Sequence, residues 1–135
     1  MFKHPLTEVA AFAFLFMMCS SIALADSRAC SDPQVKEALA LKAQNSRNSY
    51  VDMLNRQGRS VWAKVSGIHE VETLSSNKES RRKKCFAKAS MESNMGMLAQ
   101  PVWMTYTLGQ YDDGKQYTEI HVMSADERQS FSRDR

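Results

Sequence analysis

Residues 102–123, VWMTYTLGQYDDGKQYTEIHVM, decide the fold of this chain. Two runs with alternating apolar residues flank Asp112-Asp113-Gly114, and Asp-Gly between such runs is a strong hairpin signal. A two-residue loop at 113–114 would place the two apolar rows on opposite faces. A three-residue loop, with Gly114 in the left-handed conformation, pairs Tyr111 with Lys115 and keeps both rows on one face. The sequence therefore predicts a three-residue loop.

This register separates an apolar face of the hairpin from a polar one, and such a match normally fixes strand pairing. The apolar face carries Met104, Tyr106, Leu108, Ile120 and Val122. The polar face carries Thr105, Thr107, Glu119 and His121. A hairpin of this kind is half-buried, so the rest of the chain must supply a partner layer.

The first 25 residues are predicted to be a signal peptide. An apolar run, Val9–Met18, follows a weakly basic start, and Ala23-Leu24-Ala25 fits the small-x-small rule for cleavage before Asp26. Retention as a membrane anchor is the alternative, because residues 9–25 are nearly long enough to span a bilayer. Cleavage would give a periplasmic or secreted protein with one domain over residues 26–123.

Beyond the signal, the chain carries two cysteines, Cys30 and Cys85. In an oxidising compartment they most simply pair with each other, and the long loop gives roughly 4 kcal/mol of stabilisation in the chain-entropy model. Free thiols or an intermolecular bridge are the alternatives. Because no Cys-x-x-Cys motif occurs, a thiol oxidoreductase is disfavoured.

The remaining segments predict an α+β fold, an N-terminal helix packed on a roughly four-stranded antiparallel sheet. Asp32-Pro33 is a typical helix start, and the helix either ends in the polar stretch 45–49 or continues toward Gly58. A strand from Val61 with an irregularity at Gly67, a polar loop over 75–80 and a strand over 81–91 follow. The tail, residues 124–135, is almost wholly polar and is expected to fray.

The charge pattern gives one notable basic run, while the net charge of +3 is mild. We expect no nucleic-acid partner for an exported protein of this kind. A basic run that enters a strand is typically a solvated loop or a guarded sheet edge. Its functional interpretation is a landing site for lipid headgroups, acidic glycans or an acidic protein. The run consists of Arg81, Arg82, Lys83 and Lys84.

A candidate binding surface lies on the polar face of the hairpin, where His121 shares a row with Glu119 and Tyr117. A His-Glu pair without a third ligand or a nucleophile favours a surface role, so no cofactor or metal site is predicted. Trp103 and Met123 fall on the same outer face. They mark a contact site if exposed, or they are covered by an N-terminal or C-terminal segment.

Several segments together resemble small exported bacterial proteins with a cystatin-like or NTF2-like core, a family without an assigned activity. The resemblance implies a helix on a curved antiparallel sheet and an exported protein, and it carries over no catalytic residue. The segments are Cys30–Lys36, Cys85–Ala87, Tyr106-Thr107 and Asp112–Tyr117.

Two classes of function remain. The first is a non-enzymatic protein-binding module, such as a secretion or conjugation accessory, an inhibitor or an immunity protein. The second is a small-ligand binder or enzyme with a pocket between helix and sheet. A polar pocket reaching His121 or His69 would favour the second class, and a filled core the first. Peripheral envelope association through residues 81–84 is a further alternative, and an enzyme is the less favoured interpretation because no catalytic motif occurs.

Overall fold

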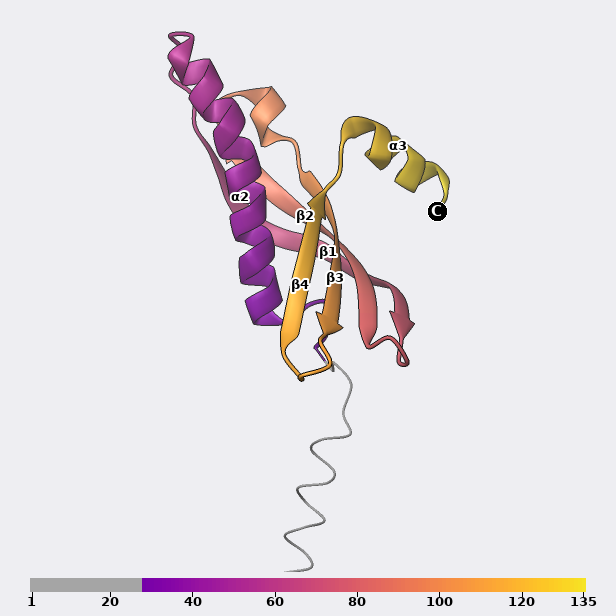
Figure 1. Ribbon diagram of the computed structural model, residues 1–135. Helices are drawn as coiled ribbons and strands as arrows, with labels where there is room; N and C mark the ends of the chain where they lie inside the picture. The colour runs from indigo at the N-terminus through magenta and orange to yellow at the C-terminus, as the bar shows by residue number, and fades with distance from the viewer. Residues whose placement is uncertain (1–27) are drawn as a thin grey trace, which may run out of the picture.

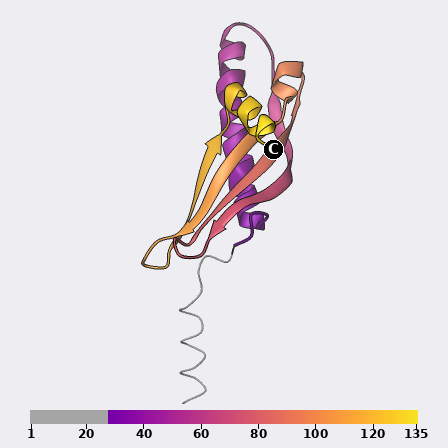
Figure 2. The ribbon, with the colours of Figure 1, turned by 90° about the vertical axis from the view of Figure 1, so that its right-hand side faces the viewer.

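The computed structural model describes residues 28–135, in which four strands form one antiparallel sheet in the order β1-β2-β3-β4. Helix α2 lies along one face of the sheet and helix α3 on the opposite side (Figures 1 and 2). The α+β prediction is confirmed, whereas the predicted signal peptide and its cleavage site lie outside the described residues. The elements are α2 (Pro33–Arg56), β1 (Ala63–Asn77), β2 (Arg82–Ser93), η1 (Gly96–Ala99), β3 (Val102–Gln110), β4 (Gln116–Val122) and α3 (Ala125–Arg133).

Helix α2 begins at the predicted cap and runs without a break through the polar stretch 45–49. The Asp32 carboxylate accepts a hydrogen bond from the Gln34 backbone N–H at 2.9 Å, and Pro33 occupies the first turn. The Gln44 side chain then binds the β1 backbone, donating to the Ala63 carbonyl and accepting from the Val65 N–H, both at 2.9 Å. This attachment to β1 supports the helix where its own sequence is a poor helix former.

The β3–β4 hairpin has the predicted loop and register. The Tyr111 N–H donates to the Lys115 carbonyl at 2.8 Å, and Gly114 has φ +89°, the left-handed conformation that favours glycine. Leu108 pairs with Thr118. The apolar row therefore faces α2, and the polar row forms the outer face of the sheet.

Strand β1 is more irregular and longer than predicted. Its register against β2 shifts next to Gly67, as predicted, and at two further places, one of which puts Glu70 at φ 53°. The predicted polar loop over 75–80 is shorter than expected, because the strand continues until Asn77 pairs with Arg82 and the turn occupies only residues 78–81. Backbone pairing continues the ladder here although the side chains are polar and exposed.

The core lies between α2 and the inner face of the sheet, and the predicted disulfide stands at one end of it. Cys30 and Cys85 are bonded, with their Cα atoms 5.8 Å apart, so the start of α2 is tied to β2. The Tyr106 hydroxyl donates to the Cys30 carbonyl at 2.8 Å. The core residues are Cys30, Val35, Leu39, Ala43, Cys85, Ala87, Ala89, Met91, Val102, Met104, Tyr106 and Leu108.

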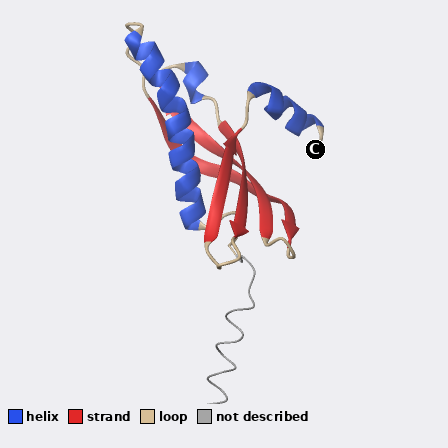
Figure 3. Cartoon of the chain, viewed as in Figure 1, coloured by secondary structure: helices blue, strands red, loops and turns tan. Residues whose placement is uncertain are grey.

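Most of the C-terminal tail forms helix α3, so the expectation that it frays was wrong (Figure 3). Ser124 and Glu127 form a reciprocal capping box in which each side chain accepts from the other residue's backbone N–H. The polar composition concealed this local signal and the docking role of Phe131. Within residues 28–135, no helix combines the length and apolar character needed to cross a membrane.

Candidate protein-binding surface

Helix α3 covers the part of the outer sheet face next to Phe86, a β2 residue whose side chain is fully buried. The Phe131 ring of α3 stacks on Phe86 with ring centroids 4.6 Å apart, and Trp103 meets both rings edge-on. Arg135 adds a cation–π contact over Phe131 and an ion pair with Glu72. The C-terminal segment therefore covers much of the apolar surface that the sequence placed on this face.

The predicted surface residues do lie on the outer face, but α3 divides them. Met123 and Trp103 are neighbours, since the Met123 N–H donates to the Trp103 carbonyl at 2.9 Å. Tyr117 lies at the other end of the hairpin, where its ring covers Gly109 and lies 4.7 Å from the Tyr111 ring. Tyr117, Glu119, His121 and Met123 line clefts that share residues with one another, whereas Trp103 lies in a separate groove beside α3.

His121 pairs with a carboxylate of α3 that the sequence reasoning did not consider. Its Nε2 lies 2.6 Å from Glu127 Oε2, and both side chains are well exposed. A backbone hydrogen bond from Ser124 and the contact with His121 hold the pKa of Glu127 below its usual range. The pair attaches the first turn of α3 to β4. Among the described residues, no group of three or more His, Cys, Asp and Glu side chains could hold a metal ion.

The basic run at residues 81–84 is distributed over two faces by the alternation of β2. Lys83 points to the helix side and donates to the Arg28 carbonyl at 2.6 Å. Arg82 and Lys84 line a small outer cleft with Glu119, and Arg81 stands in the preceding turn with φ 56°. The structure therefore does not bring the four cations together as one patch.

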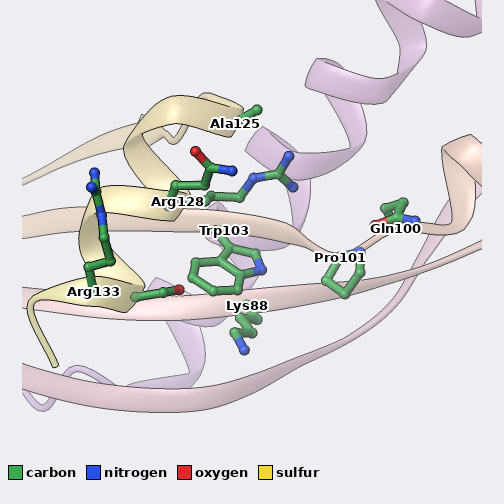
Figure 4. Close-up of a pocket in the computed structure, with 9 residues that line it drawn as sticks. Lys88, Gln100, Pro101, Trp103, Ala125, Arg128 and Arg133 are labelled. Atoms are coloured by element: carbon green, nitrogen blue, oxygen red, sulfur yellow. The ribbon is translucent and has the colours of Figure 1, made fainter.

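A larger groove, here called the α3 groove, lies between α3, the ends of β2 and β3, and the segment after η1 (Figure 4). Its volume is about 780 Å³. Trp103 lies at the centre of the lining, with Lys88 beside it, Pro101 and Gln100 toward one end and Arg133 toward the other. The full lining is Lys88, Gln100, Pro101, Trp103, Ala125, Arg128, Gln129, Ser132 and Arg133.

A second, smaller cavity of about 330 Å³ continues the α3 groove toward α2, because both are lined by Gln100 and Arg128. It adds Arg47 from α2 and two well-exposed side chains, Tyr50 and Met97. Arg47 donates to the Gln100 carbonyl at 2.7 Å, and its Nε is buried without a hydrogen-bond partner. Burial, and then the charge of Arg128, lower the pKa of Arg47.

The α3 groove was missed by the sequence reasoning except for Trp103. Its walls come from β2, the segment after η1, β3 and α3, and the smaller cavity adds α2 and η1, so the lining is scattered along the chain. One local signal existed. Ser124 followed three residues later by Glu127 is the sequence pattern of a capping box. It could have indicated the helix that forms one wall.

The sequence left open a pocket between helix and sheet, but side chains fill the space there. The inner face is occupied by fully buried side chains such as Leu39, Met104 and Leu108. The α3 groove instead lies on the outer side of the sheet and beside its end. The core is therefore filled, while two open polar clefts of about 410 and 540 Å³ on the outer face are lined by His121.

No family model, no curated protein and no solved structure matches the chain. The resemblance to cystatin-like and NTF2-like proteins therefore stays a prediction from the sequence. The function must be argued from the geometry of the surface itself.

Proposed function

We propose that this chain is an exported, non-enzymatic protein-binding module and that the α3 groove is its contact surface. The disulfide between Cys30 and Cys85 suggests an oxidising, extracytoplasmic environment. Together with the predicted signal over residues 1–25, it supports a periplasmic or secreted protein. A secretion or conjugation accessory, an inhibitor and an immunity protein all remain members of this class.

One observation carries the proposal: the α3 groove combines Trp103 on its floor with arginines that form no ion pair with an acidic side chain among the described residues. Protein interfaces are enriched in aromatic residues, methionine and arginine, and depleted of glutamate and aspartate. The groove has Trp103 on its floor, with Arg128 and Arg133 on its α3 wall. Exposed Tyr50 and Met97 lie in the adjoining cavity.

The second candidate class, a small-ligand binder or an enzyme, has less support. Its pocket was expected between helix and sheet, where the side chains of the core are closely packed. His121, the best candidate for proton transfer, pairs with Glu127 at the start of α3 and lies outside the lining of the α3 groove. A helix-capping role accounts for that pair.

The test is differential capture from the native envelope with the mature domain as bait. Wild type is compared with Arg128→Glu in the groove and with Lys78→Glu, a variant of equal charge change in the exposed turn between β1 and β2. Circular dichroism checks that each bait is folded.

We expect at least one protein to be retained by wild type and by Lys78→Glu and to be lost with Arg128→Glu. Identical captured sets for all three folded baits would overturn the assignment of the α3 groove as the contact surface.

A further inference from the structure

Three arginines of the α3 groove and of the smaller cavity that continues it have no carboxylate partner among the described residues. Within residues 28–135, Arg47, Arg128 and Arg133 form no ion pair with an acidic side chain. Arg133 only donates to the Ser130 hydroxyl at 3.4 Å. Lys88, at the groove floor, is paired with Glu70 at 2.8 Å. Three arginines therefore remain available for negative charge supplied from outside.

The lining itself offers no compensation, since none of the described side chains in the α3 groove or its smaller extension is a carboxylate. Arg47 and Arg128 lie close enough to repel each other, and one Arg47 donor is buried without a partner. An oxygen anion placed between the two guanidinium groups would relieve the repulsion between them.

Apolar side chains alternate with these cations along the two joined cavities. Trp103 and Pro101 lie in the larger one, and Tyr50 and Met97 in the smaller. Met97 is 67% exposed and Tyr50 52% exposed, so both present apolar surface to an incoming ligand. A complementary ligand must therefore carry carboxylates and apolar groups close together, as a peptide does.

On the basis of the proposed function, we propose that the α3 groove and the cavity that continues it bind an acidic peptide segment of a partner protein. The carboxylates of this peptide pair with Arg47, Arg128 and Arg133, and one of its apolar side chains lies against Trp103. Arginine favours carboxylates because its planar fork donates two parallel hydrogen bonds. The concave shape disfavours a membrane surface, because a flat bilayer cannot place its headgroups on the floor of a groove.

The test measures binding of short labelled peptides in which Glu alternates with Leu, and of the same peptides with Gln in place of Glu. Changes in Trp103 fluorescence, in a Trp62→Phe background, report occupancy of the groove. We expect the Glu peptides to bind at least about tenfold more tightly than the Gln peptides, with affinity falling as salt rises. Arg128→Glu should abolish this preference, and Lys78→Glu should leave it unchanged.

Three results would overturn the inference: equal affinity for Glu and Gln peptides, no binding of either, or binding only of anionic lipid vesicles or a sulfated glycan. These results are distinguishable from failure of the proposed function. If Arg128→Glu loses a captured partner that Glu peptides cannot displace, the contact surface stands and the acidic segment is wrong. If no partner distinguishes Arg128→Glu from Lys78→Glu, the contact surface itself fails.

Discussion

The hydroxyl of Tyr106 joins β3 to the disulfide, because it donates to the Cys30 carbonyl from a nearly fully buried side chain. Burial raises the pKa of Tyr106 to about 12. The phenol is therefore harder to ionise in the folded chain than in the unfolded one, where its pKa is about 10. Its contribution to stability is fully present below pH 10 and is lost as the pH rises through 12.

The first prediction concerns the alkaline stability of Tyr106→Phe. At pH 7 this variant should lose about 1–2 kcal/mol, since the Cys30 carbonyl loses its donor. Between pH 10 and 11, wild type should lose about 1 kcal/mol more than the variant does, because only wild type must keep this phenol protonated. Urea unfolding at each pH measures both differences. Parallel pH profiles for the two proteins would contradict the account.

Gly114 gives the second prediction. A β-branched residue resists φ +89°, so Gly114→Val should lower the free energy of unfolding by roughly 1–3 kcal/mol. Gly96→Val is the matched control, since a Cβ there meets nothing within 4 Å and the backbone is not left-handed. Thermal unfolding compares them, and equal melting temperatures would speak against the assigned loop.

Residue-scale features of this kind were predictable because they depend on few residues. The loop length followed from side-chain parity around Gly114, and the pairing of Cys85 with Cys30 followed from their being the two cysteines beyond the predicted signal. The partner of His121 was not predictable in this way. Glu127 lies in a segment whose polar composition suggested no fixed structure.

At the scale of elements, the docking of α3 is the feature that most alters the surface. The third prediction is that Phe131→Ala detaches this helix, because its ring is the contact that covers Phe86. We expect faster amide exchange in α3 and easier acrylamide quenching of Trp103 in a Trp62→Phe background. The half-buried ring should cost roughly 1–2 kcal/mol. Ser130→Ala, at an exposed position of the same helix outside the lining of the α3 groove, should change neither measurement, and matching effects would argue against specific docking.

The fourth prediction concerns acid. The pKa of Glu127 is lowered in the folded state, so its contribution to α3 is present above the ordinary carboxyl pKa and lost as the pH falls through the lowered value. The protection of the α3 amides, taken relative to their intrinsic exchange rates, should therefore fall below about pH 4 in wild type. Glu127→Gln should show low protection already at pH 6 and little further change. An acid-insensitive α3 in wild type would count against this role.

Element prediction succeeded where a periodic apolar pattern existed, as in β2, β3 and β4. It failed for α3 and left the second half of α2 open, where Gln44 attaches the helix to the β1 backbone. Such contacts come from side chains distant in sequence. Only the capping-box spacing of Ser124 and Glu127 was readable in advance.

At the scale of the whole molecule, the disulfide connects the fold with the compartment. The fifth prediction is that protein recovered from cells under alkylating, non-reducing conditions has the mass of a chain beginning at Asp26 with two hydrogens fewer than the reduced form. Recovery of the full-length chain with both Cys30 and Cys85 alkylated would contradict both the export of the protein and the formation of the disulfide.

The α3 groove belongs to this scale and could not be predicted, because tertiary packing assembles it from β2, β3, α3 and the segment after η1. Trp103 was placed on the outer face by parity alone. Whether it was exposed or covered depended on Phe131, nearly thirty residues further along the chain. The candidate site thus follows from the fold and not from any motif.

The central claim is that α3 packs on the outer sheet face and forms one wall of the α3 groove. Nuclear Overhauser contacts in the mature domain in solution test it most directly. We expect contacts from the Phe131 ring to the rings of Phe86 and Trp103, together with helical shifts for residues 125–133. Random-coil shifts over this segment, without those ring contacts, would contradict the claim and remove the groove.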